Sequence, residues 1–206
     1  MSSPTASATS PQAVLDFWFG PLDGGGQPNG AHVRRWFEKN VDFDREITER
    51  FGKLHEEIVG RKHEDWLDDP RSRLAYVIVL DQFSRNMFRD NPRAFATDAQ
   101  AVAAAADGVA RGHDKPLTPD ERSFLYMPFM HSEDLAMQAR SVDLFRKLAA
   151  EAPPEQAQRR ASSVDYAQKH RDLIAKFGRF PQRNSALGRT STGDEWEYLK
   201  ESGGGF

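Results

Sequence analysis

Cysteine is absent from the 206 residues of this chain. Its absence excludes disulfides, thiol catalysis and cysteine-ligated zinc, and it fits a reducing cytoplasm, where we expect the protein to reside. Long apolar runs are absent too, and none approaches the ~20 residues that a membrane-spanning helix needs. No membrane role is therefore expected. Residues 1–11 have neither a basic start nor an apolar segment, so we predict a disordered leader rather than a signal peptide.

An excess of charge of one sign is also lacking. The chain has 28 Lys and Arg residues against 31 Asp and Glu residues, and its formal net charge is −3. This balance argues against binding nucleic acid through bulk electrostatics, so no nucleic-acid partner is expected. The sequence does not indicate an oligomeric state.

Strand patterns are scarce, whereas helical periodicity appears almost everywhere after residue 12. Ile47, Phe51, Leu54 and Ile58 recur at helical spacing, for example. We predict one all-α domain over 12–201, with about eight or nine helices in stacked antiparallel pairs. A flexible glycine-rich tail is predicted over 202–206.

Five polar residues are predicted to cap the starts of helices, because an oxygen side chain there accepts a backbone N–H. They are Asp44, Asn91, Thr118, Ser132 and Thr192. Thr118 has the strongest signal, since Pro119 follows it and Glu121 stands three residues further on.

The first motif with possible chemistry is "LDQFSRNMFRD", residues 80–90, directly after the apolar run "LAYVIV". On a helix, Asp81 faces Arg85, and Arg85 faces Arg89, because each pair is four residues apart. One interpretation is an ion pair at an exposed helix end, worth about 0.5 kcal/mol. The other is a polar wall, bordered by Asn86, in which an arginine contacts an anion through its planar fork.

The second motif, "HRDLIAKFGRFPQRNSALGR", residues 170–189, resembles the first in placing aromatic residues between arginines at a helix end. Gly178 and Pro181 end the helix, which leaves Arg179, Arg183 and Arg189 on irregular backbone, with Asn184 in the same segment. These residues are candidates for an anion site. They are equally consistent with cations that complement a helix C-terminus.

The third motif, "MHSEDLAMQAR", residues 130–140, supplies acid/base candidates. We consider His131, Glu133, His170 and Asp81 as candidate catalytic groups. His131 and Glu133 are also consistent with a simple helix start, and His170 with a hydrogen-bonded core residue. No HExxH spacing, phosphate-binding glycine loop or G-x-S-x-G elbow occurs, so neither a metal nor a cofactor is expected.

Several segments together resemble a bacterial family of unknown function, DUF924. They are "VLDFWFG", "RWF", "LDQFSRNMFR", "RAFATDAQA", "ERSFLYMPFMHSEDLAMQ", "HRDLIAKFGRFPQRN" and "LGRTST". The resemblance covers roughly residues 12–206 and implies an all-α, tetratricopeptide-like fold. It implies no reaction. Ser84 and Gln182 stand where the family often has proline and histidine.

Three functions remain open. The first is a binding module in which Arg85, Arg89, Arg179 and Arg183 line a concave groove for a small anionic molecule or peptide. The second is a hydrolase for a small anionic substrate, with His and Asp or Glu as acid and base. In the third, the motif residues form only a buried polar network that joins helices.

Overall fold

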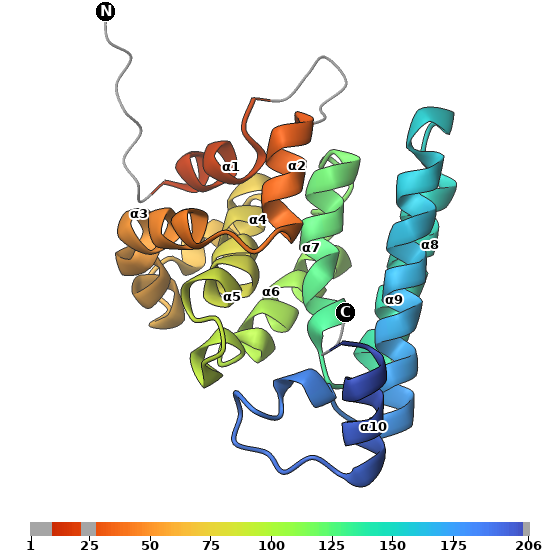
Figure 1. Ribbon diagram of the computed structural model, residues 1–206. Coiled ribbons are helices and arrows are strands. Elements are labelled where there is room, and N and C mark those ends of the chain that lie inside the picture. The colour runs from red at the N-terminus through yellow and green to blue at the C-terminus, as the bar shows by residue number, and fades with distance from the viewer. Residues whose placement is uncertain (1–9, 22–27, 204–206) are drawn as a thin grey trace, which may run out of the picture.

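The computed structural model of the protein describes residues 10–21 and 28–203 (Figure 1). The regular structure in these two ranges is helical, and no β-strand occurs there. The α-helices are α1 (Pro11–Phe19), α2 (Gly30–Phe37), α3 (Val41–Val59), α4 (Pro70–Ile78), α5 (Ser84–Met87), α6 (Asp98–Ala110), α7 (Pro119–His131), α8 (Leu135–Ala150), α9 (Ala157–Phe177) and α10 (Gly193–Glu201). The predicted all-α class is confirmed.

Shorter helical segments connect these elements. Four of them are 3-10 turns and one, η2, is a π-helix; they are η1 (Glu64–Asp68), η2 (Val79–Phe83), η3 (Pro92–Ala94), η4 (Pro154–Gln156) and η5 (Pro181–Arg183). α4, η2 and α5 follow one another without a break, so the ten α-helices of the described residues form nine continuous rods. This agrees with the predicted number. None of the described helices is long and apolar enough to cross a membrane.

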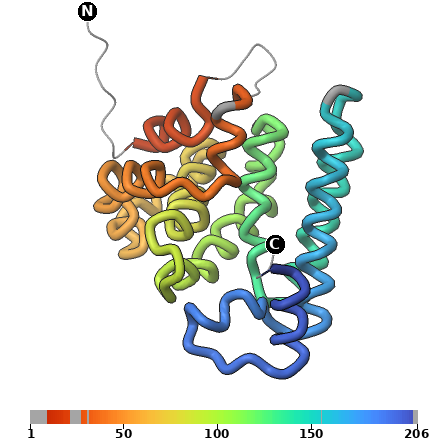
Figure 2. The backbone as a smooth tube through the Cα atoms, in the orientation of Figure 1, coloured from red at the N-terminus to blue at the C-terminus, as the bar shows by residue number. Residues whose placement is uncertain are grey.

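The helices form two groups that meet at α7. α8 packs against both α7 and α9, and these three run side by side in Figure 1. α1 and α6 pack against α4, while α3 packs against η2 and α5. Figure 2 shows the segment after α9 crossing the base of the molecule before it returns as α10.

The predicted leader and tail lie largely outside the described residues, at 1–9 and 204–206. Within the described residues, the Ser10 side chain caps α1 by accepting a hydrogen bond from the Ala13 N–H, and Pro11 is the first residue of that helix. Ser10 and Pro11 therefore belong to the start of α1 and not to the predicted leader. Proline suits this first helical position because its missing N–H would have no helical partner.

Three of the five predicted caps are confirmed. Asn91 caps η3 by accepting a hydrogen bond from the Arg93 N–H. Thr118 and Thr192 begin α7 and α10, and each forms a capping box with the glutamate three residues later. The cap of α3 is Asn40, which accepts a hydrogen bond from the Phe43 N–H, and not Asp44. Asp44 instead lies in the first turn of α3.

The start of α8 also differs from the prediction. Its cap is Asp134, whose carboxylate accepts the N–H groups of Ala136 and Met137. Ser132 stands two residues earlier and accepts a hydrogen bond from the Asp134 N–H. Aspartate and serine cap helices about equally well, so composition alone could not separate the two.

An aromatic cluster forms the centre of the core. Trp18 of α1 is 1% exposed and lies 5.8 Å from Phe83 and 5.4 Å from Phe124 between ring centroids, with both rings edge-on. Its ring also stacks on Phe43 of α3. These rings join α1, α3, η2 and α7, and so they hold the π-helix firmly in the apolar interior.

A chain of buried hydroxyl groups supports the π-helix. Thr97 Oγ1 donates to the Leu80 carbonyl at 2.6 Å, and Ser84 Oγ lies 2.9 Å from Thr97 Oγ1. Since the Thr97 proton goes to the carbonyl, Ser84 must donate to Thr97. Ser84 therefore accepts from Nε2 of the buried His55 at 2.8 Å. The direction of each hydrogen bond in this series therefore follows from the Leu80 carbonyl, which can only accept.

We expect Thr97→Val to lower the free energy of unfolding by about 1–3 kcal/mol, because Ser84 loses its buried acceptor and Leu80 a donor. Urea denaturation measures this. Thr48→Val is the matched control, since Thr48 donates to the Asp44 carbonyl at an exposed site. Its effect should stay within about 0.5 kcal/mol. Equal effects of the two substitutions would contradict the supporting role of Thr97.

Candidate functional site

The site is built around Asp81, a carboxylate in the middle of the π-helix. Its residue is 1% exposed and directly follows the buried apolar residues Val79 and Leu80. Its oxygens lie 2.8 and 3.0 Å from Nδ1 of His131, 3.0 Å from Nη1 of Arg85 and 2.5 Å from Nε2 of Gln82. A π-helix within an α-helix is rare and often occurs at functional sites.

Two opposing effects set the pKa of Asp81. Burial raises it, but Arg85 and His131 favour the ionised form more strongly and lower the pKa to about 2. Asp81 is therefore a carboxylate at neutral pH and acts only as a hydrogen-bond acceptor.

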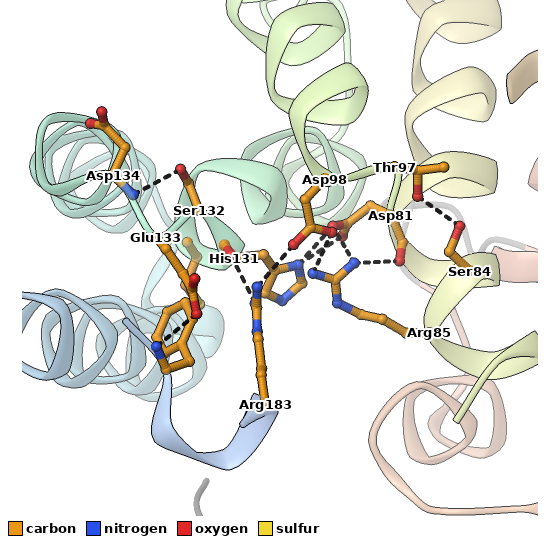
Figure 3. Close-up of polar contacts among 12 residues, drawn as sticks. Asp81, Ser84, Arg85, Thr97, Asp98, His131, Ser132, Glu133, Asp134 and Arg183 are labelled. Carbon is orange, nitrogen blue, oxygen red and sulfur yellow. Dashed lines mark hydrogen bonds and ion pairs between the residues drawn. The ribbon is translucent and has the colours of Figure 1, made fainter. Parts of the chain in front are cut away.

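His131, the last residue of α7, has its tautomer set by Asp81. Because the carboxylate has no proton, Nδ1 of His131 must donate, and Nε2 is left with a lone pair. Burial and the nearby Arg85 lower the pKa of His131 from its ordinary value, against the opposing effect of Asp81. The ring is therefore neutral at pH 7. Figure 3 shows its second nitrogen pointing away from Asp81.

Two arginines meet on a second carboxylate beside this pair (Figure 3). Nη2 of Arg85 and Nη1 of Arg183 each lie 3.0 Å from an oxygen of Asp98, at the start of α6. Arg183 also donates to the His131 carbonyl at 2.8 Å. With Asp81, the cluster has two cations and two anions, so its formal charge is zero. We call these four residues the ion-pair cluster.

Burial and Arg85 lower the pKa of Arg183 to about 10, against Asp98. Arg183 remains a cation at neutral pH. Its guanidinium carbon lies 4.5 Å from the ring centroid of Phe180 and 4.7 Å from that of Phe95. The two rings hold the group in place, as cation–π contacts do.

A pocket of about 600 Å³ lies next to the histidine. We call it the His131 pocket. Its lining residues come mainly from α2, α7 and α9 and are Trp36, Phe37, Asp120, Ser123, Phe124, Met127, Met130, His131, Phe145, Arg159, Arg160, Ser162, Ser163, Tyr166 and His170. Phe37 and Tyr166 are exposed at its rim. This size and mixture of apolar walls with a few polar groups are typical of a small-molecule site.

The structure brings together four of the residues predicted from the sequence, namely Asp81, Arg85, His131 and Arg183. A fifth, His170, lines the same pocket, with its ring centroid 6.4 Å from that of His131. His170 Nδ1 donates to the Tyr166 carbonyl one turn earlier.

Arg89 and Asn86 lie elsewhere. Both contact Asp44 of α3, Arg89 through Nε and Nη2 and Asn86 at 2.7 Å. The predicted stripe from Arg85 to Arg89 does not form, because α5 ends at Met87 and helical spacing no longer applies beyond it.

The remaining candidates fasten the C-terminal segment. Arg179 and Asn184 both contact Glu195 of α10, which Arg179 holds at 2.6 and 2.8 Å. Glu133 accepts two hydrogen bonds from Arg189 and one from the backbone of Phe180. Glu133 is therefore occupied by structural partners. Of the four arginines predicted to line one groove, only Arg85 and Arg183 share an ion-pair partner.

Sequence reasoning missed Asp98 and the lining residues Trp36, Arg159 and Arg160. Asp98 lies in the first turn of α6, where an acidic residue usually complements the helix dipole, so nothing marked it as a partner of two distant arginines. Within the described residues, no group of three or more His, Cys, Asp or Glu side chains could hold a metal ion.

A family model described as a bacterial protein of unknown function (DUF924) matches residues 14–203. The chain belongs to this family. A solved structure titled as a protein of unknown function, ATU0120 from Agrobacterium tumefaciens, is similar at 36% identity with a TM-score of 0.79. The match covers 93% of this chain and 97% of that one. No curated protein matches the chain. The family resemblance predicted from the motifs is confirmed, and it assigns no activity.

We expect Asp98→Asn to destabilise the protein by about 3 kcal/mol, because it leaves the buried Arg183 and the partly buried Arg85 facing each other without their shared carboxylate. Adding Arg183→Met should recover part of this loss, since Arg85 still has Asp81. Urea denaturation of both single variants and the double variant gives the coupling energy. Asp42, which forms an exposed ion pair with Arg45, serves as the control. Asp42→Asn should lower the free energy of unfolding by less than about 0.5 kcal/mol. If the losses in the free energy of unfolding from Asp98→Asn and Arg183→Met were additive, the interaction of these two residues in the ion-pair cluster would be contradicted.

The stability of the protein should depend on pH through His170. Burial lowers its pKa to about 4, against the Tyr166 carbonyl, whereas the unfolded chain has the ordinary value of 6.5. The unfolded state therefore binds more protons between these two values. The contribution of His170 is complete above pH 6.5 and is lost as the pH falls towards about 4.

His170→Gln should remove this dependence while retaining a donor for the Tyr166 carbonyl. The free energies of unfolding of the two proteins, measured from pH 7 to about pH 4 by urea denaturation, should then converge as the pH falls, by up to ~1.4 kcal/mol per pH unit. Parallel curves would show that His170 titrates normally in the folded protein.

Proposed function

We propose that the His131 pocket is the active site of a hydrolase for small molecules. His131 acts as general base, Asp81 orients it, and water is the nucleophile. The observation that carries the proposal is the hydrogen bond of 2.8 Å from His131 Nδ1 to the buried carboxylate of Asp81, at the wall of a 600 Å³ pocket. A carboxylate in this position holds the imidazole in the tautomer whose Nε2 can accept a proton.

In the proposed reaction, Nε2 of His131 takes a proton from a water molecule as the water oxygen adds to a carbonyl carbon of the substrate. The imidazolium that forms is stabilised by Asp81. The bond from that carbon to the leaving group then breaks, and His131 returns its proton to the leaving atom. The acid product and the protonated leaving group account for all atoms of substrate and water.

The charges of the site favour this function over an anion-binding groove. Arg85 and Arg183 already face Asp81 and Asp98, so the ion-pair cluster has no formal charge left to attract an anion. The cluster instead holds His131 from two sides, through the Asp81 carboxylate and through the carbonyl contact of Arg183. Its role in the proposal is to keep the base in position.

The test uses a panel of small carboxylic esters and thioesters with the purified protein. We expect the wild type to turn over at least one of them, and His131→Gln to lower kcat/KM by about 10²–10⁴. His63→Gln is the matched control, because His63 precedes η1, contacts Glu57 of α3 and lies outside the pocket. It should leave the rate unchanged. Thermal unfolding checks that both variants are folded.

The pH profile gives an independent readout. The pKa of His131 is below 6.5, so the base is present throughout the neutral range, and kcat/KM should fall only in the acid range as Nε2 is protonated. Equal rates for wild type and His131→Gln, or no turnover of any ester or thioester above buffer, would count against the proposed hydrolase.

A further inference from the structure

The end of the His131 pocket opposite the histidine holds two adjacent arginines that share one carboxylate. Asp120, near the start of α7, is 2% exposed. Arg160 lies 2.8 Å from it and Arg159 lies 2.9 Å from the same oxygen. Both arginines come from the first turn of α9, and all three residues line the pocket.

This end differs in charge from the end at His131. Two arginines and one aspartate leave a formal charge of +1, whereas the ion-pair cluster is neutral. The nearby Arg122 does not change the balance, because it is paired with Glu151. An anion that enters the pocket is therefore drawn to the Arg159 end, in a setting with apolar walls where charge interactions are less screened than in water.

Arg159 is better placed than Arg160 to donate hydrogen bonds to a ligand. Arg160 is 2% exposed and uses its three nitrogens on Gln156, Ser123 and Asp120. The side chain of Arg159 is 37% exposed. Its Nη1 and Nη2 contact the Asp120 carboxylate at 3.2 and 2.9 Å, whereas its Nε makes no hydrogen bond to any described residue. Its guanidinium carbon lies 5.9 Å from the ring centroid of Trp36. The Asp120 and Trp36 contacts orient the guanidinium while part of its donor fork stays available.

We propose that Arg159 binds the carboxylate of an elongated organic acid whose apolar body lies against Trp36 and Phe124. Arginine suits this ligand because its fork matches a carboxylate in a bidentate geometry. In terms of the proposed function, on which this inference builds, the acid is the substrate, and its scissile bond is remote from the carboxylate.

The length of α7 bounds the ligand. Asp120 and His131 are eleven residues apart on this helix, which corresponds to about 16 Å at the ordinary rise. The side chains at both ends reach into the pocket, so a ligand that contacts Arg159 and His131 is shorter than this. A medium-length chain fits, whereas acetate is too short to contact the aromatic walls.

The probes are octanoate, octanamide and acetate, and binding is measured by isothermal titration calorimetry. We expect octanoate to bind the wild type and to bind Arg159→Gln at least about tenfold more weakly, because a charge-assisted pair is lost. Octanamide and acetate should bind more weakly than octanoate to the wild type. Arg146→Gln is the matched control, since Arg146 is an exposed arginine of α8 outside the pocket. It should bind octanoate as the wild type does.

Equal affinities for octanoate and octanamide, or unchanged octanoate binding by a folded Arg159→Gln, would overturn this inference. His131→Gln separates it from the hydrolase. That variant should bind octanoate with wild-type affinity, since the carboxylate lies at the other end. If octanoate binds through Arg159 but no ester is turned over, the ligand class stands and the hydrolase fails. If esters are turned over without any effect of Arg159, the hydrolase stands and this inference fails.

Discussion

The structure depends on one constraint, the burial of the Asp81 carboxylate inside a core helix. An unpaired carboxylate there would cost several kcal/mol, so its partners must arrive from other elements in good geometry. Arg85 comes from the next turn, and His131 comes from the end of α7. The π-helix that carries Asp81 also carries the buried apolar residues Leu80 and Phe83, and the buried hydroxyl groups of Thr97 and Ser84 support the same turn.

From Asp81 the ion pairs continue outward to the C-terminal segment. Asp98 links Arg85 to Arg183, and Arg183 returns to the carbonyl of His131. Each link joins residues that are far apart in the sequence, up to 85 positions for Asp98 and Arg183. Ion pairs of this kind add little net stability compared with apolar packing, because desolvation offsets their attraction. In this structure they specify position, and the group they position is the imidazole of His131.

The sequence predicted what depends on local spacing. Helical periodicity gave the all-α class, and the interval of four residues gave the contact of Asp81 with Arg85. The same rule failed for Arg89 because the helix ends before it. The capping rule failed for Asp44, whose carboxylate binds Arg89, because Asn40 caps α3 instead. The likeness of the two arginine motifs correctly suggested that Arg85 and Arg183 belong together. The pocket itself could not be predicted, because its two ends come from α7 and α9, whose packing no local pattern specifies.

The unequal charges of the two ends of the pocket bear on how such a site would work. Binding energy accelerates a reaction only when it is used to place the reacting bond, so a site gains from contacts remote from the chemistry. In the proposed function, a single net cation at the Arg159 end selects and orients the acid at a distance from the proposed base, His131. The neutral ion-pair cluster matters for the same reason: a free cation beside His131 would depress its pKa further and weaken it as a base. Asp81 and Asp98 oppose this effect, because both carboxylates raise the pKa of His131.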